Sequence, residues 1–382
     1  MKISCLQENL NRGLAIVGRA VATRATLPVT QNVLLSVDQS MLKLSATNLE
    51  VAITTWTGAM IEEEGAVTVP ARLLTEFVSS LPNDRINLEV QPDTSVLQLS
   101  CARSKATIHG TDAGEFPPIP TVDEAIAARV DPRALRSAIS RVAFAAATEE
   151  SRPVLTGVEM KLDGDRFSLA AADGFRLAVQ HGTLLQPVES EIKVIIPART
   201  LNELNRLLGD QEEPVEIMMT PAKGQVMFRV RGGETVEVVS QLLQGAFPNY
   251  EQLIPKGYQT RAVLDLPALL RAARTAAIFA RDGSNIIRVQ LVPTDGGEGK
   301  GKLVISARSE EVGDNEDEVD VEAIEGEEGK IAFNSRYLLD VLSVLERGKV
   351  SLETTTSSSP GVFKPIDSED YIHVVMPMFV QW

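Results

Sequence analysis

The sequence predicts an α+β protein made of three repeated domains, each with two helices and a largely antiparallel sheet. A segment of one design occurs three times. It has a short apolar strand, then Pro or Asn at a helix start, an Arg two residues later and an amphipathic helix. The copies occupy residues 67–81, 194–208 and 331–342. The Pro or Asn positions lie 127 and 137 residues apart, so the repeated unit is a domain and is too long for a solenoid.

Helices are predicted at the repeated segments and once before each of them. Pro suits the first turn of a helix and Asn suits its cap. Apolar residues then recur at helical spacing, as at Leu201, Leu204 and Leu208. The preceding helices are expected at residues 8–24, 131–149 and 265–281. Alternating apolar runs such as 86–90 and 96–99 follow in hairpin order, which favours antiparallel sheets.

Two Phe-Pro segments, at 115–120 and 246–250, mark the ends of the first two repeats. Proline cannot continue a central strand, so these segments read as connectors between domains. The expected domains are residues 1–122, 123–255 and 256–382.

Composition is typical of a globular protein, with 382 residues of which 44% are hydrophobic and 23% charged. No apolar run approaches the roughly 20 residues that span a bilayer, and no signal peptide is evident. The two cysteines, Cys5 and Cys101, have no metal or redox spacing, and the three histidines are far apart. We therefore expect a cytoplasmic protein, without a metal, a cofactor or a membrane partner.

The net charge of −15 argues against nucleic acid as a partner when taken as a total. Its distribution argues otherwise. The six predicted helix windows together carry +6, so the rest of the chain carries −21, with a strongly acidic stretch at 308–328. Arginines on solvated helix faces are also compatible with a purely structural role.

Motifs for catalysis are missing from the sequence. It contains neither the HExxH zinc motif nor the G-x-S-x-G elbow, and its scattered acidic residues offer no fixed catalytic pair. The sequence therefore predicts a protein that is not an enzyme.

Five motifs run from end to end of the chain, namely 24–28 (RATLP), 116–120 (FPPIP), 173–177 (DGFRL), 247–250 (FPNY) and 375–378 (VMPM). On these motifs the chain resembles the bacterial DNA polymerase III β subunits, the sliding clamps of the replicative polymerase. The family pattern usually has Thr and His where this chain has Ala172 and Phe175. It usually closes with Arg-Leu after the last Met, whereas this chain continues as Phe-Val-Gln-Trp at 379–382.

The resemblance implies the DNA clamp fold and a head-to-tail homodimer, a ring with helices lining its central hole. It implies that the ring encircles duplex DNA without sequence specificity, as a processivity factor associated with the nucleoid. A weakly basic lining would permit sliding, because phosphate contacts carry no sequence information. The candidate DNA-binding residues are Arg24, Arg72, Arg199 and Arg336. For the dimer interface, the family places Ile278 and Phe279 against residues 102–109 of the partner.

The resemblance also implies a hydrophobic peptide groove that tethers the replicative polymerase catalytic subunit, the ATP-dependent clamp loader and repair or translesion polymerases. Its expected residues are Leu155, Gly174, Arg176, Leu177, Pro248, Leu253, Val374, Met376, Pro377 and Met378. Leu and Met supply an adaptable apolar surface. Arg176 is expected at the rim as a donor to peptide carbonyls, and Phe175 adds apolar surface that favours aromatic ligands.

Two other classes of protein remain open on the sequence. One is a DNA-processing enzyme such as a nuclease, which would turn over DNA with a divalent metal. The other is a scaffold protein that does not act on DNA. Retention on circular but not on linear DNA would separate a clamp from both.

Overall fold

The computed structural model describes residues 1–24, 26–91, 94–121, 126–220, 224–281, 284–294, 299–345 and 347–382. The domain boundary expected near residue 122 lies outside these ranges. The described chain divides into two compact units. The first comprises Met1–Arg136, Leu184–Val188 and Arg199–Leu242, and the second comprises Ser137–Thr183, Glu189–Ala198 and Leu243–Trp382. A division into three domains at the expected boundaries stays a prediction.

The first unit contains two antiparallel sheets. The smaller has the strand order β5-β1-β7-β8-β9. Its strands are β1 (Lys2–Leu6), β5 (Met60–Glu63), β7 (Arg85–Val90), β8 (Val96–Cys101) and β9 (Ser104–His109). The larger has the order β10-β15-β16-β17-β4-β3-β2-β6. Its strands are β2 (Asn32–Asp38), β3 (Met41–Thr47), β4 (Val51–Thr57), β6 (Ala66–Pro70), β10 (Ala128–Val130), β15 (Val215–Met219), β16 (Gln225–Gly232) and β17 (Glu234–Gln241).

The second unit contains one antiparallel sheet of twelve strands, in the order β14-β11-β12-β13-β25-β24-β23-β18-β21-β20-β19-β22. The first six in sequence are β11 (Gly157–Asp163), β12 (Arg166–Ala172), β13 (Arg176–Thr183), β14 (Ile192–Pro197), β18 (Thr260–Asp265) and β19 (Ile286–Pro293). The others are β20 (Gly301–Ser309), β21 (Gly313–Gly326), β22 (Gly329–Asn334), β23 (Lys349–Thr354), β24 (Gly361–Pro365) and β25 (Tyr371–Val375).

All six predicted helices are present. They are α1 (Gln7–Val17), α2 (Ala71–Ser80), α3 (Pro132–Val142), α4 (Ala198–Leu208), α5 (Leu266–Arg281) and α6 (Ser335–Val344). α1 and α3 end earlier than expected and tighten into 3-10 turns, η1 (Gly18–Ala20) and η4 (Ala143–Ala145), which is common at helix ends. Four further 3-10 turns are η2 (Pro28–Gln31), η3 (Ala113–Glu115), η5 (Pro153–Thr156) and η6 (Tyr250–Leu253).

Side-chain caps explain why three of these helices begin where they do. The carboxylate of Asp131 accepts the Ala134 N–H at 2.9 Å, and that of Asp265 accepts the Ala268 N–H at 3.1 Å. In α6 the side-chain oxygen of Asn334 accepts the Arg336 N–H at 3.0 Å. Each bond satisfies a backbone donor that the first helical turn leaves without a partner.

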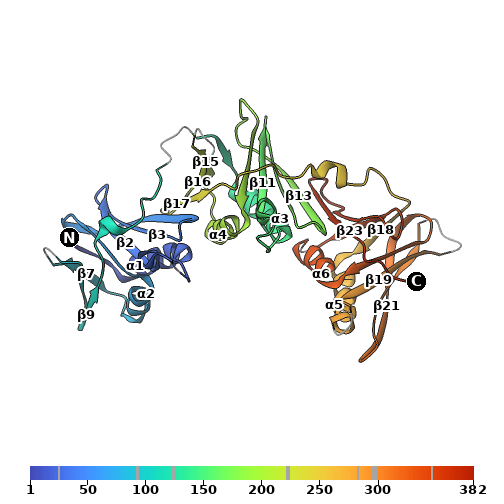
Figure 1. Cartoon of the computed structure of the whole chain (residues 1–382), viewed down its shortest axis with the longest axis horizontal. Helices are drawn as coiled ribbons and strands as arrows, with labels where there is room; N and C mark the ends of the chain where they lie inside the picture. The colour runs from blue at the N-terminus through green and yellow to red at the C-terminus, as the bar shows by residue number, and fades with distance from the viewer. Residues whose placement is uncertain are drawn as a thin grey trace. The chain divides into compact units, whose positions relative to one another are not determined.

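Neighbouring repeats share sheets, through the pairing of β17 with β4 in the first unit and of β13 with β25 in the second. The helices cover the sheets with apolar faces. α1 packs against β4 and α2, and α5 packs against α6, β20 and β21. Figure 1 shows α1 near α2 and α5 next to α6. Leu10 and Leu14 of α1 are completely or almost completely buried, as are Phe333 and Phe363 in the second unit. Burial of such side chains supplies most of the favourable free energy of folding.

In the part of the chain that the structure describes, no helix is long and apolar enough to cross a membrane. The same described ranges hold no group of three or more His, Cys, Asp or Glu residues arranged to bind a metal ion.

Candidate functional site

The ten residues expected to form a peptide groove all lie in the second unit. Leu155, Leu177 and Val374 belong to one buried apolar cluster. Leu253 and Met376 expose 53% and 42% of their surface to solvent. The other five differ in exposure, with Pro377 buried, Arg176 and Met378 half-buried, and Gly174 and Pro248 exposed. The set therefore combines a packed apolar base with exposed apolar side chains.

Pairing of β13 with β25 brings together two segments that are about 200 residues apart in the sequence. Leu177 pairs with Val374, and Arg176 with Val375. Beyond the strand end, the Met376 N–H donates to the carbonyl oxygen of Phe175 at 2.8 Å. The Met378 N–H donates to the carbonyl of Ala332 at 2.8 Å, so the chain's last segment is held against β22.

The tight turn between β12 and β13, at residues 173–175, forms another part of the candidate site. The Asp173 carboxylate accepts the backbone N–H groups of Phe175 and Arg176 at 2.9 and 3.0 Å. Gly174 has a φ of +93°, which glycine adopts without strain. The Asp-Gly pair in the sequence thus indicates an Asx-type turn, and this turn leaves Phe175 exposed.

Arg176 points into the structure beneath this turn. Its side chain is 9% exposed. Its Nε donates to Asp173 at 3.0 Å, one terminal nitrogen donates to Asp340 of α6, and the other donates to the carbonyl of Phe144 at 2.9 Å. Because these donors are occupied internally, the structure differs from the expectation that Arg176 serves a peptide from the rim.

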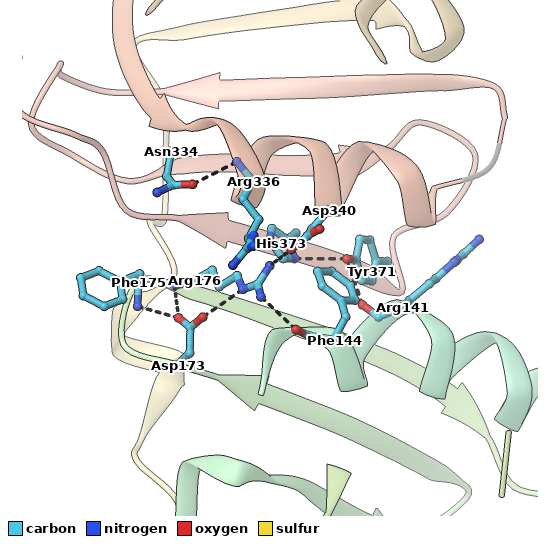
Figure 2. A network of polar contacts seen from close by, with 10 residues as sticks. All are labelled: Arg141, Phe144, Asp173, Phe175, Arg176, Asn334, Arg336, Asp340, Tyr371 and His373. Carbon is cyan, nitrogen blue, oxygen red and sulfur yellow. Dashed lines mark hydrogen bonds and ion pairs between the residues drawn. The ribbon is translucent and has the colours of Figure 1, made fainter. Parts of the chain in front are cut away.

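Aromatic rings pack on both sides of the Arg176 guanidinium, and Figure 2 shows the side formed by Phe144 and His373. The guanidinium carbon lies 4.6 Å from the ring centre of Tyr337 and 5.2 Å from that of Phe144. Tyr337 in turn stacks on Phe175, with ring centres 6.2 Å apart, and Phe144 stacks on His373 at 5.5 Å. The exposed ring of Phe175 is therefore connected through packed rings to the interior of the unit.

His373 is completely buried at the inner end of these contacts. One ring nitrogen lies 3.2 Å from the hydroxyl of Tyr371, which itself donates to the carbonyl of Arg141 at 3.1 Å. The other nitrogen has no hydrogen-bond partner among the described residues. Burial first, and then the charge of Arg176, lowers the pKa of His373 to about 3. The imidazole is thus neutral in the folded protein at ordinary pH.

Three of the four candidate DNA-binding arginines occupy one position in the repeated design. Arg72, Arg199 and Arg336 are each the second residue of a helix, in α2, α4 and α6, and all are exposed. Arg72 forms an ion pair with Glu76 at 2.8 Å. Arg24 is exposed after η1. Arg336 differs in its surroundings, because it directly precedes Tyr337 and points from α6 toward the Asp173–Arg176 turn (Figure 2).

The expected interface residues lie near the end of α5. Ile278 exposes 59% of its surface, and Phe279 is half-buried. Arg271 and Arg274 are exposed on the same helix, at spacings that place them on the face of Ile278. This face therefore combines an apolar residue with two cations.

Several residues that the structure places at the site were not predicted from the sequence. Tyr337 and Asp340 contact Arg176 from α6, Phe144 contacts it from η4, and Arg152 donates to the carbonyl of Asp173 at 3.2 Å. Tyr337 and Asp340 could have been noticed, since they follow the Arg of the third repeated segment. Phe144 and Arg152 have no signal in the sequence.

Comparison with known proteins gives matches along the whole chain. Three family models match in sequence order and are described as the N-terminal, central and C-terminal domains of the DNA polymerase III beta subunit. They cover residues 1–120, 129–249 and 251–379.

Among curated proteins, the beta sliding clamp of Synechococcus elongatus is 33% identical and that of Pseudomonas putida 34%. The alignments cover 99% of this chain and 99% or more of each relative. Among solved structures, the DNA polymerase sliding clamp of Bacillus subtilis has a TM-score of 0.92 at 27% identity, with full coverage of both chains. The DNA polymerase III subunit beta of Pseudomonas aeruginosa has a TM-score of 0.89 at 31% identity, also with full coverage.

Replacing His373 with Gln should flatten the dependence of the unfolding free energy on pH. The pKa of about 3 in the folded protein lies below the ordinary value of 6.5. The stabilising contribution of the neutral imidazole is therefore complete above pH 6.5 and is lost as pH falls toward 3. Within this window the slope approaches about 1.4 kcal/mol per pH unit for one proton. Urea denaturation at several pH values between 7.5 and 4.5 measures it.

The control for this experiment is His109→Gln, which removes an exposed imidazole. Burial raises the pKa of Glu159 and of Glu234. These two groups therefore increase the unfolding free energy as the pH falls, which is opposite to the effect of His373. The comparison is therefore made between variant and unaltered protein at each pH. Parallel curves for His373→Gln and the unaltered protein would contradict the assignment.

Proposed function

The chain belongs to the DNA polymerase III beta subunit family and acts as a sliding clamp, a non-catalytic processivity factor of DNA replication, and from this premise we propose how its own residues carry out that role. The family implies DNA, a polymerase and a second copy of the chain as partners. We propose that two copies close head to tail into a ring around duplex DNA.

Two strand edges of opposite charge support the head-to-tail arrangement. β9 is the last strand of its sheet and pairs only with β8 among the described strands. Arg103 directly precedes β9, and Lys105 lies within it. Strand β18 pairs only with the second half of β21. Within the described chain, residues 313–320 of β21 therefore pair with β20 on one side and have an open edge on the other. That half-strand carries five acidic residues, Asp314, Glu316, Asp317, Glu318 and Asp320.

Joining β9 of one copy to this half of β21 in the other would continue a sheet across the interface. Unpaired strand edges readily form such pairings, and opposite charges select the partner and its register. The exposed Ile278 and the half-buried Phe279 on α5 supply apolar contact area for the same interface. The two surfaces are different, as a head-to-tail contact requires.

Weak contacts to phosphate suit a ring that slides. Arg24 and Arg199 are exposed with no ion pair among the described residues, whereas the charge of Arg72 is shared with Glu76. We add Arg271 and Arg274, which are exposed on α5. A few such arginines give salt-dependent, sequence-independent attraction, while the acidic remainder of the chain prevents tight adhesion.

We propose that other proteins dock on the surface formed by the ten groove residues. The observation that carries this proposal is their convergence around the β13–β25 pairing, with a buried apolar base and exposed Leu253 and Met376. We propose that short apolar peptides bind there, from the polymerase catalytic subunit, the ATP-dependent clamp loader and repair or translesion polymerases. A cytoplasmic, nucleoid-associated location is part of the same proposal.

Glutamate at both Ile278 and Phe279 should convert the dimer to folded monomers. Burial of two unpaired carboxylates costs on the order of several kcal/mol, and the interface would lose its apolar contact. Gel filtration with light scattering at micromolar concentration measures the mass. Leu185→Glu serves as the control, because Leu185 is a similarly exposed apolar residue that lies in none of β9, β21 and α5. A double variant that remains dimeric would contradict the assignment of this interface.

Retention on DNA should depend on topology. Once loaded on a nicked circle, the protein should remain bound in high salt, because encirclement needs no strong contacts, and it should leave when the circle is cut. Binding to short free duplex should be weak and should fall steeply with salt. Gel filtration of protein–DNA mixtures before and after linearisation gives the comparison. Equal retention on both forms would point to tight contacts in place of encirclement.

Changing both Leu177 and Met378 to Ala should weaken binding of a Gln-Leu-x-Leu-Phe peptide at least tenfold, or about 1.4 kcal/mol. Fluorescence anisotropy with a labelled peptide measures it, and the variant should still dimerise. Leu177 is 2% exposed, so its truncation can also disturb folding. Leu253→Ala therefore provides a second test, since Leu253 is exposed and its loss should lower affinity in an intact protein. Unchanged affinity in both variants would place the groove elsewhere.

A further inference from the structure

A polar cavity of about 620 Å³ lies in the second unit, where β19 begins and β20 ends. Its volume is in the range of sites that bind small molecules. The residues that line it include Ser284, Arg288, Arg308, Ser309, Glu310 and Glu311, which are all polar, and Ile286 adds one apolar side chain. None of the ten groove residues lines this cavity. It is therefore a second candidate site, separate from the proposed groove.

The guanidinium of Arg288 has a donor that nothing in the described chain accepts. Arg288 is half-buried on β19, and its Nε has almost no exposed surface and no hydrogen-bond partner among the described residues. One terminal nitrogen donates to the carbonyl of Gln381 at 3.4 Å, which is longer than an ordinary N–H···O bond. A buried charged donor without an acceptor is unfavourable, so an acceptor supplied by a ligand would stabilise it.

Arg308 brings a second cation to the same cavity. It is exposed on β20 and forms no ion pair within the described ranges, although Asp314 stands opposite it on β21. Opposite Arg288 the neighbouring strands place Ser306 and Ala332, neither of which is a carboxylate. Two guanidinium groups without a carboxylate partner thus line one cavity, in a chain of net charge −15. Guanidinium groups of this kind match the oxygens of phosphate, often with two parallel hydrogen bonds.

Two carboxylates border the cavity at the turn between β20 and β21. Glu310 and Glu311 are both exposed, so water solvates their charges. They balance the formal charge of the two arginines, and the cavity does not attract anions by its net charge. It offers donors for an anion on the strands and acceptors for hydroxyl groups at the turn. A ligand that carries both an anion and hydroxyl groups matches this arrangement.

We propose that this cavity binds a phosphorylated sugar. Arg288 and Arg308 donate to the phosphate oxygens, and the sugar hydroxyls donate to Glu310 and Glu311. Inorganic phosphate alone would leave most of the 620 Å³ to water and would not use the carboxylates. The inference goes beyond the clamp function and does not depend on the groove or on the ring.

The test is isothermal titration calorimetry on the full-length protein with ribose 5-phosphate, inorganic phosphate and ribose. Ribose 5-phosphate should bind with a dissociation constant below about 1 mM, at least about fivefold tighter than inorganic phosphate, and ribose should not bind. Binding of the two phosphates should weaken as salt is added, because exposed charges are screened.

Variants separate the two halves of the site. Arg288→Gln and Arg308→Gln should each weaken ribose 5-phosphate at least about tenfold. Arg308 is exposed, so its replacement keeps the test valid where Arg288→Gln disturbs the fold. The matched control is Arg166→Gln, which removes an exposed arginine of β12 in the same sheet and should leave the affinity unchanged.

Replacing both glutamates at the turn with Gln should act in two directions. Inorganic phosphate should bind more tightly, because two like charges are removed from its neighbourhood. The preference for ribose 5-phosphate over inorganic phosphate should shrink, because neutral amides accept weaker hydrogen bonds from the sugar hydroxyls than carboxylates do.

Three results would overturn the proposal. The first is no binding of ribose 5-phosphate, or binding that both arginine variants leave unchanged. The second is equal affinity for ribose 5-phosphate and inorganic phosphate, which would leave only a bare anion site. The third is displacement of ribose 5-phosphate by short duplex DNA at low salt, which would assign the two arginines to nucleic acid.

Discussion

The guanidinium of Arg176 joins three parts of the chain that share no neighbourhood in the sequence. It reaches the turn at Asp173, the helix α6 at Asp340 and the carbonyl of Phe144, and it lies between two aromatic rings. A charge at 9% exposure is unfavourable unless such partners replace water. Once they are in place, the loss of both carboxylates would leave a buried charge uncompensated, which is strongly destabilising. The relative placement of the Asp173 turn, α6 and η4 therefore depends on this side chain, and Gly174 and Leu177, two of the residues proposed for docking, lie in or beside that turn.

Much of this organisation could be predicted from the sequence, because the signals are local. Helix starts followed from Pro and Asn positions and from apolar spacing, and the structure has all six helices. The Asp-Gly turn before β13 also followed from residue types, since Asp supplies the acceptor and Gly the positive φ. The residues proposed for docking come from resemblance to a family, and their docking role stays a prediction, although Leu155, Leu177 and Val374 share one buried cluster. The repeated Arg at the second helical position appeared as expected in α2, α4 and α6.

What the sequence could not provide depends on contacts between distant segments. The pairing of β17 with β4 and of β13 with β25 extends sheets across repeats, and alternating apolar residues do not specify which strand edge will be the neighbour. Arg176 was expected at the rim of the groove, as a donor to peptide carbonyls. Its inward position depends on Asp340 and Phe144, which no motif links to it. The neutral state of His373 likewise results from burial that only the folded chain creates.

Each of the three described sheets ends in two outer strands, and β21 is also open along its first half. The described edges proposed for assembly, β9 and the first half of β21, differ in charge and belong to opposite ends of the chain. Unlike surfaces of this kind join copies in one direction only, so their assembly either closes or extends into a filament. In a closed pair, every feature of one copy recurs in the same sense around the axis. Both of the proposed docking sites would then face the same side of the ring, where two partner proteins could bind at the same time.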